Sequence, residues 1–468
     1  MTVTQCHILA FTVALVLSFP AFAQEARSDP AAMDSVAHSR AVETAIWGMP
    51  IASFHALRES FARDAGAAPM DIVYLSRPAD WKLQVPTPNA TTLYALVMSN
   101  TRDGPLVLEV PPSKGASLFG SFNDAWHEPV VDLGPAGEDQ GRGGKYLLVP
   151  PGYEHPVPAG YIAVRFKTYN GYAGIRAIPD TDDDAGVAAA LAMVRRLRLY
   201  PLARAANLPA QKYIDMSGRV WNGIAALDET FYTRLAAMID EEPPRPRDMI
   251  ALQMLATLGI EKGKPFTPDA KVGDLLSRAA REAQAQFLRT AEALPTFSKG
   301  SYWRVPLAMV GPETGFTYER NGRLDFDNRG QTFFELFAPP ARLGGATFYL
   351  GVSQDANGNP LVGDKAYRLR VPPNVPARQF WAVTVYSQQT AAFIRESPRV
   401  EVNSFQQLSR NADGSVDVYF SERPPAGHET NWAYIRPGER WFPYFRWYGP
   451  EPALFDHRWV LPNIEEVK

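Results

Sequence analysis

Proline is the feature of this sequence that most restricts its fold. The chain of 468 residues contains 41 prolines, about 9% against a usual ~5%. Proline breaks helices and cannot donate the hydrogen bond that a central strand needs, which argues against an all-helical bundle. With 46% apolar and 21% charged residues, the composition is that of a globular protein, and the length suggests two or three domains.

Residues 1–23 have the pattern of a secretory signal peptide. An apolar run from residue 8 to 20 is followed by Ala21, Phe22 and Ala23, which places small residues at the −3 and −1 positions of a cleavage site. The run is shorter than the about 20 apolar residues that cross a bilayer, and no basic residue precedes it, which departs from the usual pattern. We expect a periplasmic or secreted mature chain without a membrane span; the alternative is a buried N-terminal helix.

The single cysteine, Cys6, lies within this leader. The mature chain would therefore have no thiol, which excludes disulfides, thiolate catalysis and cysteine-ligated metals. The net charge is −3 and no basic run occurs, which argues against nucleic acid as a partner. The sequence also lacks a P-loop and a dinucleotide fingerprint after a strand, so no cofactor is expected.

Residues 31–181 are predicted to form an N-terminal domain. Apolar side chains recur at helical spacing over residues 35–65, where Pro50 should kink the helix or split it in two. Short apolar runs punctuated by Gly and Pro follow, as in an antiparallel β-sandwich. These runs lie at residues 93–98, 106–110, 117–122, 129–133, 146–149 and 161–166.

Residues 182–300 are predicted to form a mostly helical middle region. Asp182, Asp183 and Asp184 precede an alanine- and leucine-rich stretch that reaches Tyr200. Acidic residues suit the positive end of a helix dipole, so we interpret the triplet as a helix N-cap, with a calcium loop as the alternative. Further helices are expected at residues 228–240, 247–258 and 269–293.

Residues 301–468 return to a strand pattern and are predicted to form a C-terminal β-sandwich domain. Asn357-Gly358 and Asp413-Gly414 are strong tight-turn signals between apolar runs. The predicted fold class is α+β and rich in β structure, with two antiparallel β-sandwich or jelly-roll-like lobes and a helical region between them. The clearest strands of this last domain lie at residues 346–352, 367–371, 380–386 and 416–420.

Two separate stretches carry a resemblance to bacterial families. The run PTPNATTLY at residues 86–94, followed by GPLVLEVP at 104–111, resembles the domain-of-unknown-function family numbered 1254. The run NADGSVDVYF at 411–420, with RWYGP at 446–450, resembles its usual partner, the family numbered 1214. The resemblance implies a two-lobed bacterial β protein with helical segments between the lobes, often exported, and it supplies no catalytic residues.

The best candidate for acid–base chemistry is the segment Asn123 to Glu128. On an extended strand, Asp124, Trp126 and Glu128 would share one face, and His127 would lie on the other with Asn123. A buried Asp–Glu pair in a cleft can exchange protons with a substrate. Asp124, His127 and Glu128 are therefore the candidate catalytic residues, and solvated acids at a strand end are the alternative.

A metal at His127 is a further alternative for this segment. A metal site needs at least three ligands, and the nearest other histidine in the sequence is His155. No metal site is predicted.

A second candidate cluster comprises Asn89, Thr92 and Tyr94, together with Thr91. Asn and Thr between prolines commonly hold a turn through bonds to the backbone. Their amide and hydroxyl groups can equally donate and accept hydrogen bonds with a polar ligand.

The C-terminal segment 431–459 contains ten aromatic residues interleaved with arginines. Aromatic rings of this density usually fill a core. Arginine stacked on an aromatic ring can instead line a groove for sugars, aromatic acids or an anionic ligand. Trp432, Arg446 and Tyr448 are therefore candidate ligand contacts, and Trp126 is a fourth.

These observations favour an exported protein that binds a small polar, aromatic or sugar-like ligand, with its pocket at the junction of the lobes. The first alternative is a hydrolase or lyase that uses the acids and histidine of residues 124–128. The second is an envelope-associated module that binds another protein. A homo-oligomer is compatible with all three.

Overall fold

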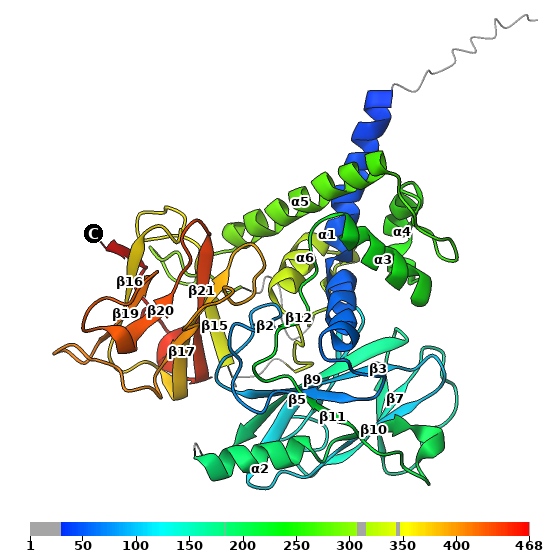
Figure 1. Cartoon of the computed structure of the whole chain (residues 1–468), viewed down its shortest axis with the longest axis horizontal. Coiled ribbons are helices and arrows are strands. Elements are labelled where there is room, and N and C mark those ends of the chain that lie inside the picture. Colours follow the sequence, from blue (N-terminus) through cyan, green and yellow to red (C-terminus); the bar gives the residue numbers. More distant parts are fainter. Residues whose placement is uncertain (1–29, 182, 307–314, 343–346, 468) are drawn as a thin grey trace, which may run out of the picture.

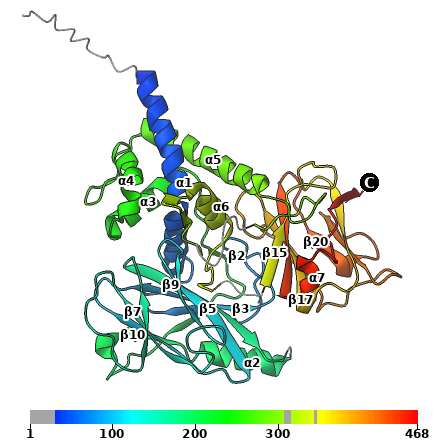
Figure 2. The ribbon, with the colours of Figure 1, turned by 180° about the vertical axis from the view of Figure 1, so that it is seen from behind.

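The computed structural model of this protein describes residues 30–181, 183–306, 315–342 and 347–467. Two lobes built from sheets flank a group of helices: the N-terminal lobe lies at one end of these helices and the C-terminal lobe lies beside them (Figure 1). The view from behind shows the same arrangement (Figure 2). The predicted leader, residues 1–23, lies outside the described residues.

The N-terminal lobe contains a six-stranded and a four-stranded sheet, in which most neighbouring strands are antiparallel. The first sheet has the order β11 (Tyr213–Asp215), β1 (Ile72–Tyr74), β3 (Leu93–Asn100), β9 (Asn170–Pro179), β5 (Ala116–Asp124), β6 (Pro129–Leu133). The second has the order β10 (Arg198–Pro201), β4 (Leu106–Val110), β7 (Gly144–Val149), β8 (Tyr161–Arg165). Leu106 and Leu108 of β4 share one core with Leu118 and Ile175 of the first sheet. Val107 faces a second core, as the two-residue period of a strand requires.

The helix α1 (Pro30–Arg63) connects the helical group to the N-terminal lobe. It continues through Pro50, so of the two predicted outcomes the split into two helices is wrong, and the kink stays a prediction. Proline has no N–H to donate to the carbonyl of Ile46. Opposite this point Gly330 lies so close that a Cβ built on it would be 2.7 Å from that carbonyl oxygen, and Arg329 donates a hydrogen bond of 2.9 Å to the neighbouring carbonyl of Trp47.

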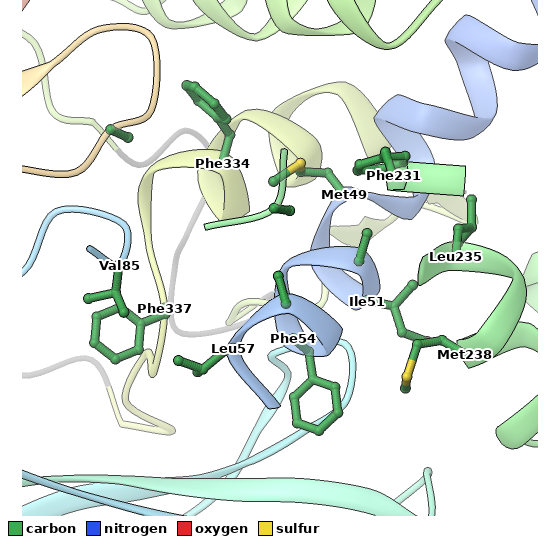
Figure 3. Close-up of a cluster of buried hydrophobic side chains, with 14 of the residues drawn as sticks. Met49, Ile51, Phe54, Leu57, Val85, Phe231, Leu235, Met238, Phe334 and Phe337 are labelled. Carbon is green, nitrogen blue, oxygen red and sulfur yellow. The ribbon is translucent and has the colours of Figure 1, made fainter. Parts of the chain in front are cut away.

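Four helices pack around α1 (Figure 1). They are α3 (Glu229–Glu241), α4 (Met249–Ala256), α5 (Ala270–Ala293) and α6 (Phe326–Glu335). Figure 3 shows apolar side chains of α1, among them Met49, Ile51 and Phe54, in one buried cluster with Phe231 and Leu235 of α3. The helices α1 and α3 approach each other closely at Gly48 of α1. A Cβ at this position would lie only 2.9 Å from both methyl carbons of Leu235. Burial of this cluster stabilises the group.

The C-terminal lobe contains two four-stranded sheets that share a core. One has the order β15 (Thr347–Gly351), β21 (Trp441–Pro450), β17 (Ala377–Ser387), β18 (Glu401–Asn403). The other has the order β20 (Trp432–Tyr434), β19 (Val416–Ser421), β16 (Ala366–Val371), β22 (Glu465–Val467). Val383 and Phe445 of the first sheet meet Leu369 and Val418 of the second in this core.

The remaining elements are short. They are the pairs β2 (Leu83–Gln84) with β12 (Trp221–Asn222) and β13 (Glu319–Arg320) with β14 (Arg323–Leu324), and the helices α2 (Asp184–Val194) and α7 (Pro452–Phe455). The carboxylate of Asp183 accepts a hydrogen bond of 2.8 Å from the N–H of Gly186, so the predicted N-cap of α2 is confirmed; Asp182 lies outside the described residues.

The segment after α2 corrects one prediction. The helix was expected to reach Tyr200, but it ends at Val194 and residues 198–201 form β10 beside β4. Buried Leu197 and Leu199 alternate along this segment, which is the period of a strand rather than of a helix, and join the core of the N-terminal lobe. Together with β11 and β12, β10 adds strands to the N-terminal part of the middle region.

The fold is α+β with several mostly antiparallel sheets, as predicted. The finer jelly-roll connectivity stays a prediction. Within the described ranges, no helix is sufficiently long and apolar to cross a membrane.

Candidate functional site

The segment after β5 forms a tight turn rather than the expected extended strand. The side chain of Asp124 accepts hydrogen bonds from the backbone N–H groups of Trp126 (2.8 Å) and Glu128 (3.0 Å). His127 adopts a positive φ of 57°, a conformation that needs such support in a residue other than glycine. Asp124, Trp126 and Glu128 all contact Arg245, whereas His127 contacts Tyr172.

The two acids of the turn face arginines that come from the link between α3 and α4. Arg245 lies 3.2 Å from the carboxylate of Glu128 and 3.8 Å from that of Asp124. Arg247 donates a second hydrogen bond to Glu128, and Lys167 lies 3.6 Å away. Because both carboxylates are buried, a negative charge on either of them depends on these cations.

The acids differ in their proton affinity. Burial, aided by the charge of Glu128, raises the pKa of Asp124 to about 7. For Glu128, burial alone would raise the pKa, but Arg245 and Arg247 outweigh it, and the pKa lies below its ordinary value. The environment therefore separates a proton-holding acid from an ionised one, a combination that can support acid–base chemistry.

His127 does not take part in this pair. Its Nδ1 lies 2.6 Å from the hydroxyl of Tyr172, its ring stacks on Phe333 at a centroid distance of 5.2 Å, and the residue is fully buried. The hydroxyl of Tyr172 also accepts a hydrogen bond from the N–H of Ala338, which leaves its proton free for a neutral imidazole. Burial lowers the pKa of His127 to about 3, so the ring is neutral.

Trp126 is the link between this charged turn and a cavity. The guanidinium groups of Arg245 and Arg329 lie 4.9 and 5.1 Å from its ring centroid. The ring of Trp47 meets it edge-on at 4.9 Å. Cation–π and edge-to-face contacts of this kind hold an indole in one orientation.

The cavity has a volume of about 340 Å³. It lies between α1, the end of α3, α4 and the turn after β5. Its walls are mainly apolar and aromatic, and they comprise Trp47, Ile51, Trp126, Ile239, Glu242, Pro243, Pro244, Asp248, Met249, Leu252, Gln253, Ala256, Ile260, Glu261 and Lys262.

The buried acids of the cavity wall already have hydrogen-bond donors. Asp248 accepts from the indole N–H of Trp47 at 3.1 Å. Glu242 accepts from the backbone N–H groups of Tyr169 (2.6 Å) and Asn170 (3.0 Å). These acids therefore serve to fix the walls, and the surface left for a ligand is largely apolar.

The other predicted ligand contacts gather elsewhere, where β21 faces the N-terminal lobe. Along this strand Phe445 and Trp447 enter the core of the C-terminal lobe, while Tyr444, Arg446 and Tyr448 alternate with them on the opposite face. All three are buried, because this face contacts α6 at Tyr444 and the N-terminal region at Arg446 and Tyr448.

Arg446 is enclosed by tyrosine rings. Its guanidinium lies 5.0, 5.4 and 5.5 Å from the ring centroids of Tyr349, Tyr386 and Tyr444. It donates hydrogen bonds to the hydroxyl of Thr384 (2.7 Å) and the carbonyl of Thr87 (3.1 Å). The arginine–aromatic stacking predicted for this segment is thus present, inside the molecule.

Asn89 and Tyr94 belong to the same region. The hydroxyl of Tyr94 accepts a hydrogen bond of 3.0 Å from the N–H of Asn89, whose amide donates to the hydroxyl of Tyr448. The side chain of Asn89 also accepts from the N–H of Thr92 at 3.1 Å, so the predicted turn role is present too. The hydroxyl of Thr92 is buried without a hydrogen-bond partner among the described residues.

Trp432 lies outside both clusters, in β20, where its indole donates to the carbonyl of Ser421 at 3.0 Å. Sequence reasoning missed Arg245 and Arg247, because they follow two prolines in a segment that has the pattern of a solvated connector. It also missed Tyr349, a residue of an ordinary strand. No group of three or more possible metal ligands occurs in the ranges that the structure describes.

Comparison with protein families gives two matches. Residues 71–201 match a family described as a protein of unknown function (DUF1254), and residues 346–452 match another described in the same way (DUF1214). The two resemblances expected from the sequence are confirmed, in the expected order.

Two solved structures are similar to this chain, and the likeness to the first of them supports the fold. The crystal structure of the VPA0106 protein from Vibrio parahaemolyticus is 17% identical, with a TM-score of 0.54 over 92% of this chain and 100% of that one. An uncharacterized protein from Burkholderia cenocepacia is 14% identical, with a TM-score of 0.40 over 93% of this chain and 95% of that one. No curated protein matches the sequence.

Proposed function

Since this chain joins a DUF1254 region to a DUF1214 region, two families described only as of unknown function, we propose its function from geometry. The protein is an exported binding protein for a small, largely apolar ligand, and the ligand occupies the cavity beside Trp47 and Trp126. The observation that carries this proposal is the cavity itself, with its volume of about 340 Å³ and its indole-lined inner wall. Small-molecule sites are commonly about 300–1,000 Å³ and mainly apolar.

The size and chemistry of the walls select the ligand class. A cavity of roughly 150 Å³ lined by apolar side chains already holds a benzene molecule, so this one suits a substituted ring or a short branched chain. Ile51, Ile239 and Leu252 line its sides, and the wall acids Glu242 and Asp248 are already bonded. A ligand rich in hydroxyl groups would lose hydrogen bonds to water here without replacement.

The mouth of the cavity is also apolar. Met249, which lines the cavity, is 66% exposed, and the adjacent Ile250 is 78% exposed. Exposed apolar side chains beside a cavity suit the passage of an apolar molecule.

The enzymatic alternative has less support from this geometry. None of Asp124, His127 and Glu128 is among the residues that line the cavity, and the ring of His127 is enclosed by Tyr172 and Phe333. The proton-holding Asp124 remains the one feature that favours it.

The test is binding of a neutral, largely apolar probe, benzyl alcohol, followed by tryptophan fluorescence and by the thermal midpoint. Binding to the folded state raises that midpoint. Ala256→Phe places a ring in the cavity and should abolish saturable binding. Thr257→Phe adds the same ring one residue later, outside the cavity lining, and should retain it. Equal binding by both variants, or no saturable binding by the wild type, would contradict the proposal.

A further inference from the structure

A second cluster of charged and aromatic side chains lies where the two lobes meet, away from the cavity. Arg176 of β9 pairs directly with Tyr94 of β3, so their side chains share one face of the six-stranded sheet. Across the junction, Tyr349 of β15 pairs with Arg446 of β21. One arginine thus comes from each lobe.

Tyr349 lies between these two arginines. Its ring centroid is 5.0 Å from the guanidinium of Arg446, and its hydroxyl bonds with Arg176. Burial alone would raise the pKa of Tyr349, but the charges of Arg176 and Arg446 outweigh it and lower the pKa below its ordinary value. The local potential at this hydroxyl is therefore positive.

The positive charges exceed the negative charges around them. Neither Arg176 nor Arg446 forms a direct ion pair with a carboxylate of the described ranges. Glu401 reaches Arg446 only through the hydroxyl of Thr384, which lies 2.7 Å from both. Buried charges are normally paired, and these two guanidinium groups have no directly bonded carboxylate in the described part of the chain, so the cluster can accept a further negative charge.

Two buried polar atoms of this cluster also have no hydrogen-bond partner among the described residues. They are the Nε atom of Arg446 and the hydroxyl oxygen of Thr92. Arg446 is only 2% exposed, whereas Arg176 and Tyr349 are half-buried. The cluster therefore has a closed inner end and a side that reaches solvent.

We propose that this junction binds the carboxylate of a small aromatic acid, held between Arg176 and Arg446 beside the hydroxyl of Tyr349. A single negative charge completes the charge balance, and a guanidinium group matches a carboxylate through two parallel hydrogen bonds. The ring of Tyr349, which is half-buried and lies beside Arg446, favours an aromatic body on the ligand.

The experiment measures benzoate binding to the full mature chain by calorimetry at constant ionic strength, with inorganic phosphate as a parallel probe. The wild type should bind benzoate saturably and phosphate at least about tenfold more weakly. Arg176→Gln removes one guanidinium at the accessible side and should weaken benzoate binding by at least about tenfold, as expected for a charged hydrogen bond. Arg165→Gln is the matched control at an exposed arginine and should bind like the wild type.

Two further variants keep the result interpretable. Tyr349→Phe keeps the ring and should weaken benzoate binding less than Arg176→Gln does. Ala256→Phe, which fills the cavity of the proposed function, should leave benzoate binding unchanged. The variant therefore separates binding at the junction from binding in the cavity.

Three results would overturn the inference. One is equal benzoate binding by wild type and Arg176→Gln, and another is tighter binding of phosphate than of benzoate. The third is an absorbance signal at 295 nm at neutral pH, which indicates an ionised tyrosine, if Tyr349→Phe abolishes that signal. That signal would mean that the phenolate of Tyr349 itself supplies the missing negative charge.

Discussion

The side-chain amide of Asn89 donates a hydrogen bond to the hydroxyl of Tyr448, a residue 359 positions further along the chain. Asn89 lies in the DUF1254 region and Tyr448 in the DUF1214 region. A second contact between the regions joins the hydroxyl of Thr91 to the carboxylate of Glu401 at 3.0 Å. The two family regions are therefore halves of one buried polar junction, and neither half would keep these groups satisfied alone.

Tyr448→Phe tests the strength of this junction. The substitution keeps the ring, which stacks on Phe380 at a centroid distance of 3.9 Å, but leaves the buried amide of Asn89 without its acceptor. We expect the free energy of unfolding to fall by about 1–3 kcal/mol, measured by urea denaturation. Tyr419→Phe, at a half-buried tyrosine of β19, is the control and should change it by less than about 0.5 kcal/mol. Equal effects of the two variants would show that the hydrogen bond across the junction contributes nothing.

Gly330→Ala tests the contact between α6 and α1. A Cβ at residue 330 would lie 2.7 Å from the carbonyl oxygen of Ile46 and 2.9 Å from the ring of Phe287. The helices would have to separate, and we expect a loss of roughly 1–3 kcal/mol in the free energy of unfolding. Gly273→Ala in α5 is the opposite case, because nothing lies within 4 Å of its Cβ position, and it should stabilise by about 0.5–1 kcal/mol. The same sign of change in both variants would contradict the packing described above.

Glu335 should make stability depend on pH. Burial raises its pKa from 4.5 to about 7, against the opposing hydrogen bond from Tyr444. The native state therefore holds this proton more tightly than the unfolded chain does. The stabilisation is complete below pH 4.5 and is lost as the pH rises to about 7.

Glu335→Gln isolates this contribution, because the amide does not titrate. Relative to that variant, the wild type should lose on the order of 3 kcal/mol of unfolding free energy between pH 4.5 and pH 8. Urea denaturation at several pH values measures both proteins. Parallel pH dependences of the wild type and the variant would contradict a raised pKa at Glu335.

Two short strands of the N-terminal lobe were predictable from the sequence, whereas its longest strand, β9, was not predicted. The segments predicted at 106–110 and 129–133 are β4 and β6 to the residue, because Pro or Gly stands at both ends of each apolar run. The helix expected up to Tyr200 was wrong, since the pairing of β10 with β4 is a tertiary contact that local composition does not carry. Tertiary burial overrides helix propensity at such points.

The two clusters were predictable only in part. The sequence indicated Asn89 and Tyr94 in one segment and Arg446 and Tyr448 in another. That these segments lie together is visible only in the folded structure. In β21 Phe445 and Trp447 enter the core of the C-terminal lobe and Tyr444, Arg446 and Tyr448 lie on the opposite face, but aromatic residues on both faces hide this alternation. Arg245 was not predicted as a site residue, because a charged residue that follows two prolines is typical of a solvent-exposed connector.

Export is the part of the proposed function that depends on residues outside the described ranges. If Ala23 ends a signal peptide, a chain expressed with its leader in a bacterium should appear in the periplasm with the mass of residues 24–468. The described fold should then be unaffected, because α1 begins at Pro30, beyond the cleavage site. Large charged residues at the −1 position block signal peptidase recognition of the small-residue pattern.

Ala23→Arg should therefore accumulate the uncleaved precursor, while Ala26→Arg, three residues beyond the site, should be processed like the wild type. Intact-mass spectrometry of the periplasmic and cytoplasmic fractions distinguishes the two forms. A full-length wild-type chain in the cytoplasm would show that residues 1–23 are not a leader. The binding site beside Trp47 and Trp126 would then meet intracellular molecules, and export would have to be removed from the proposed function.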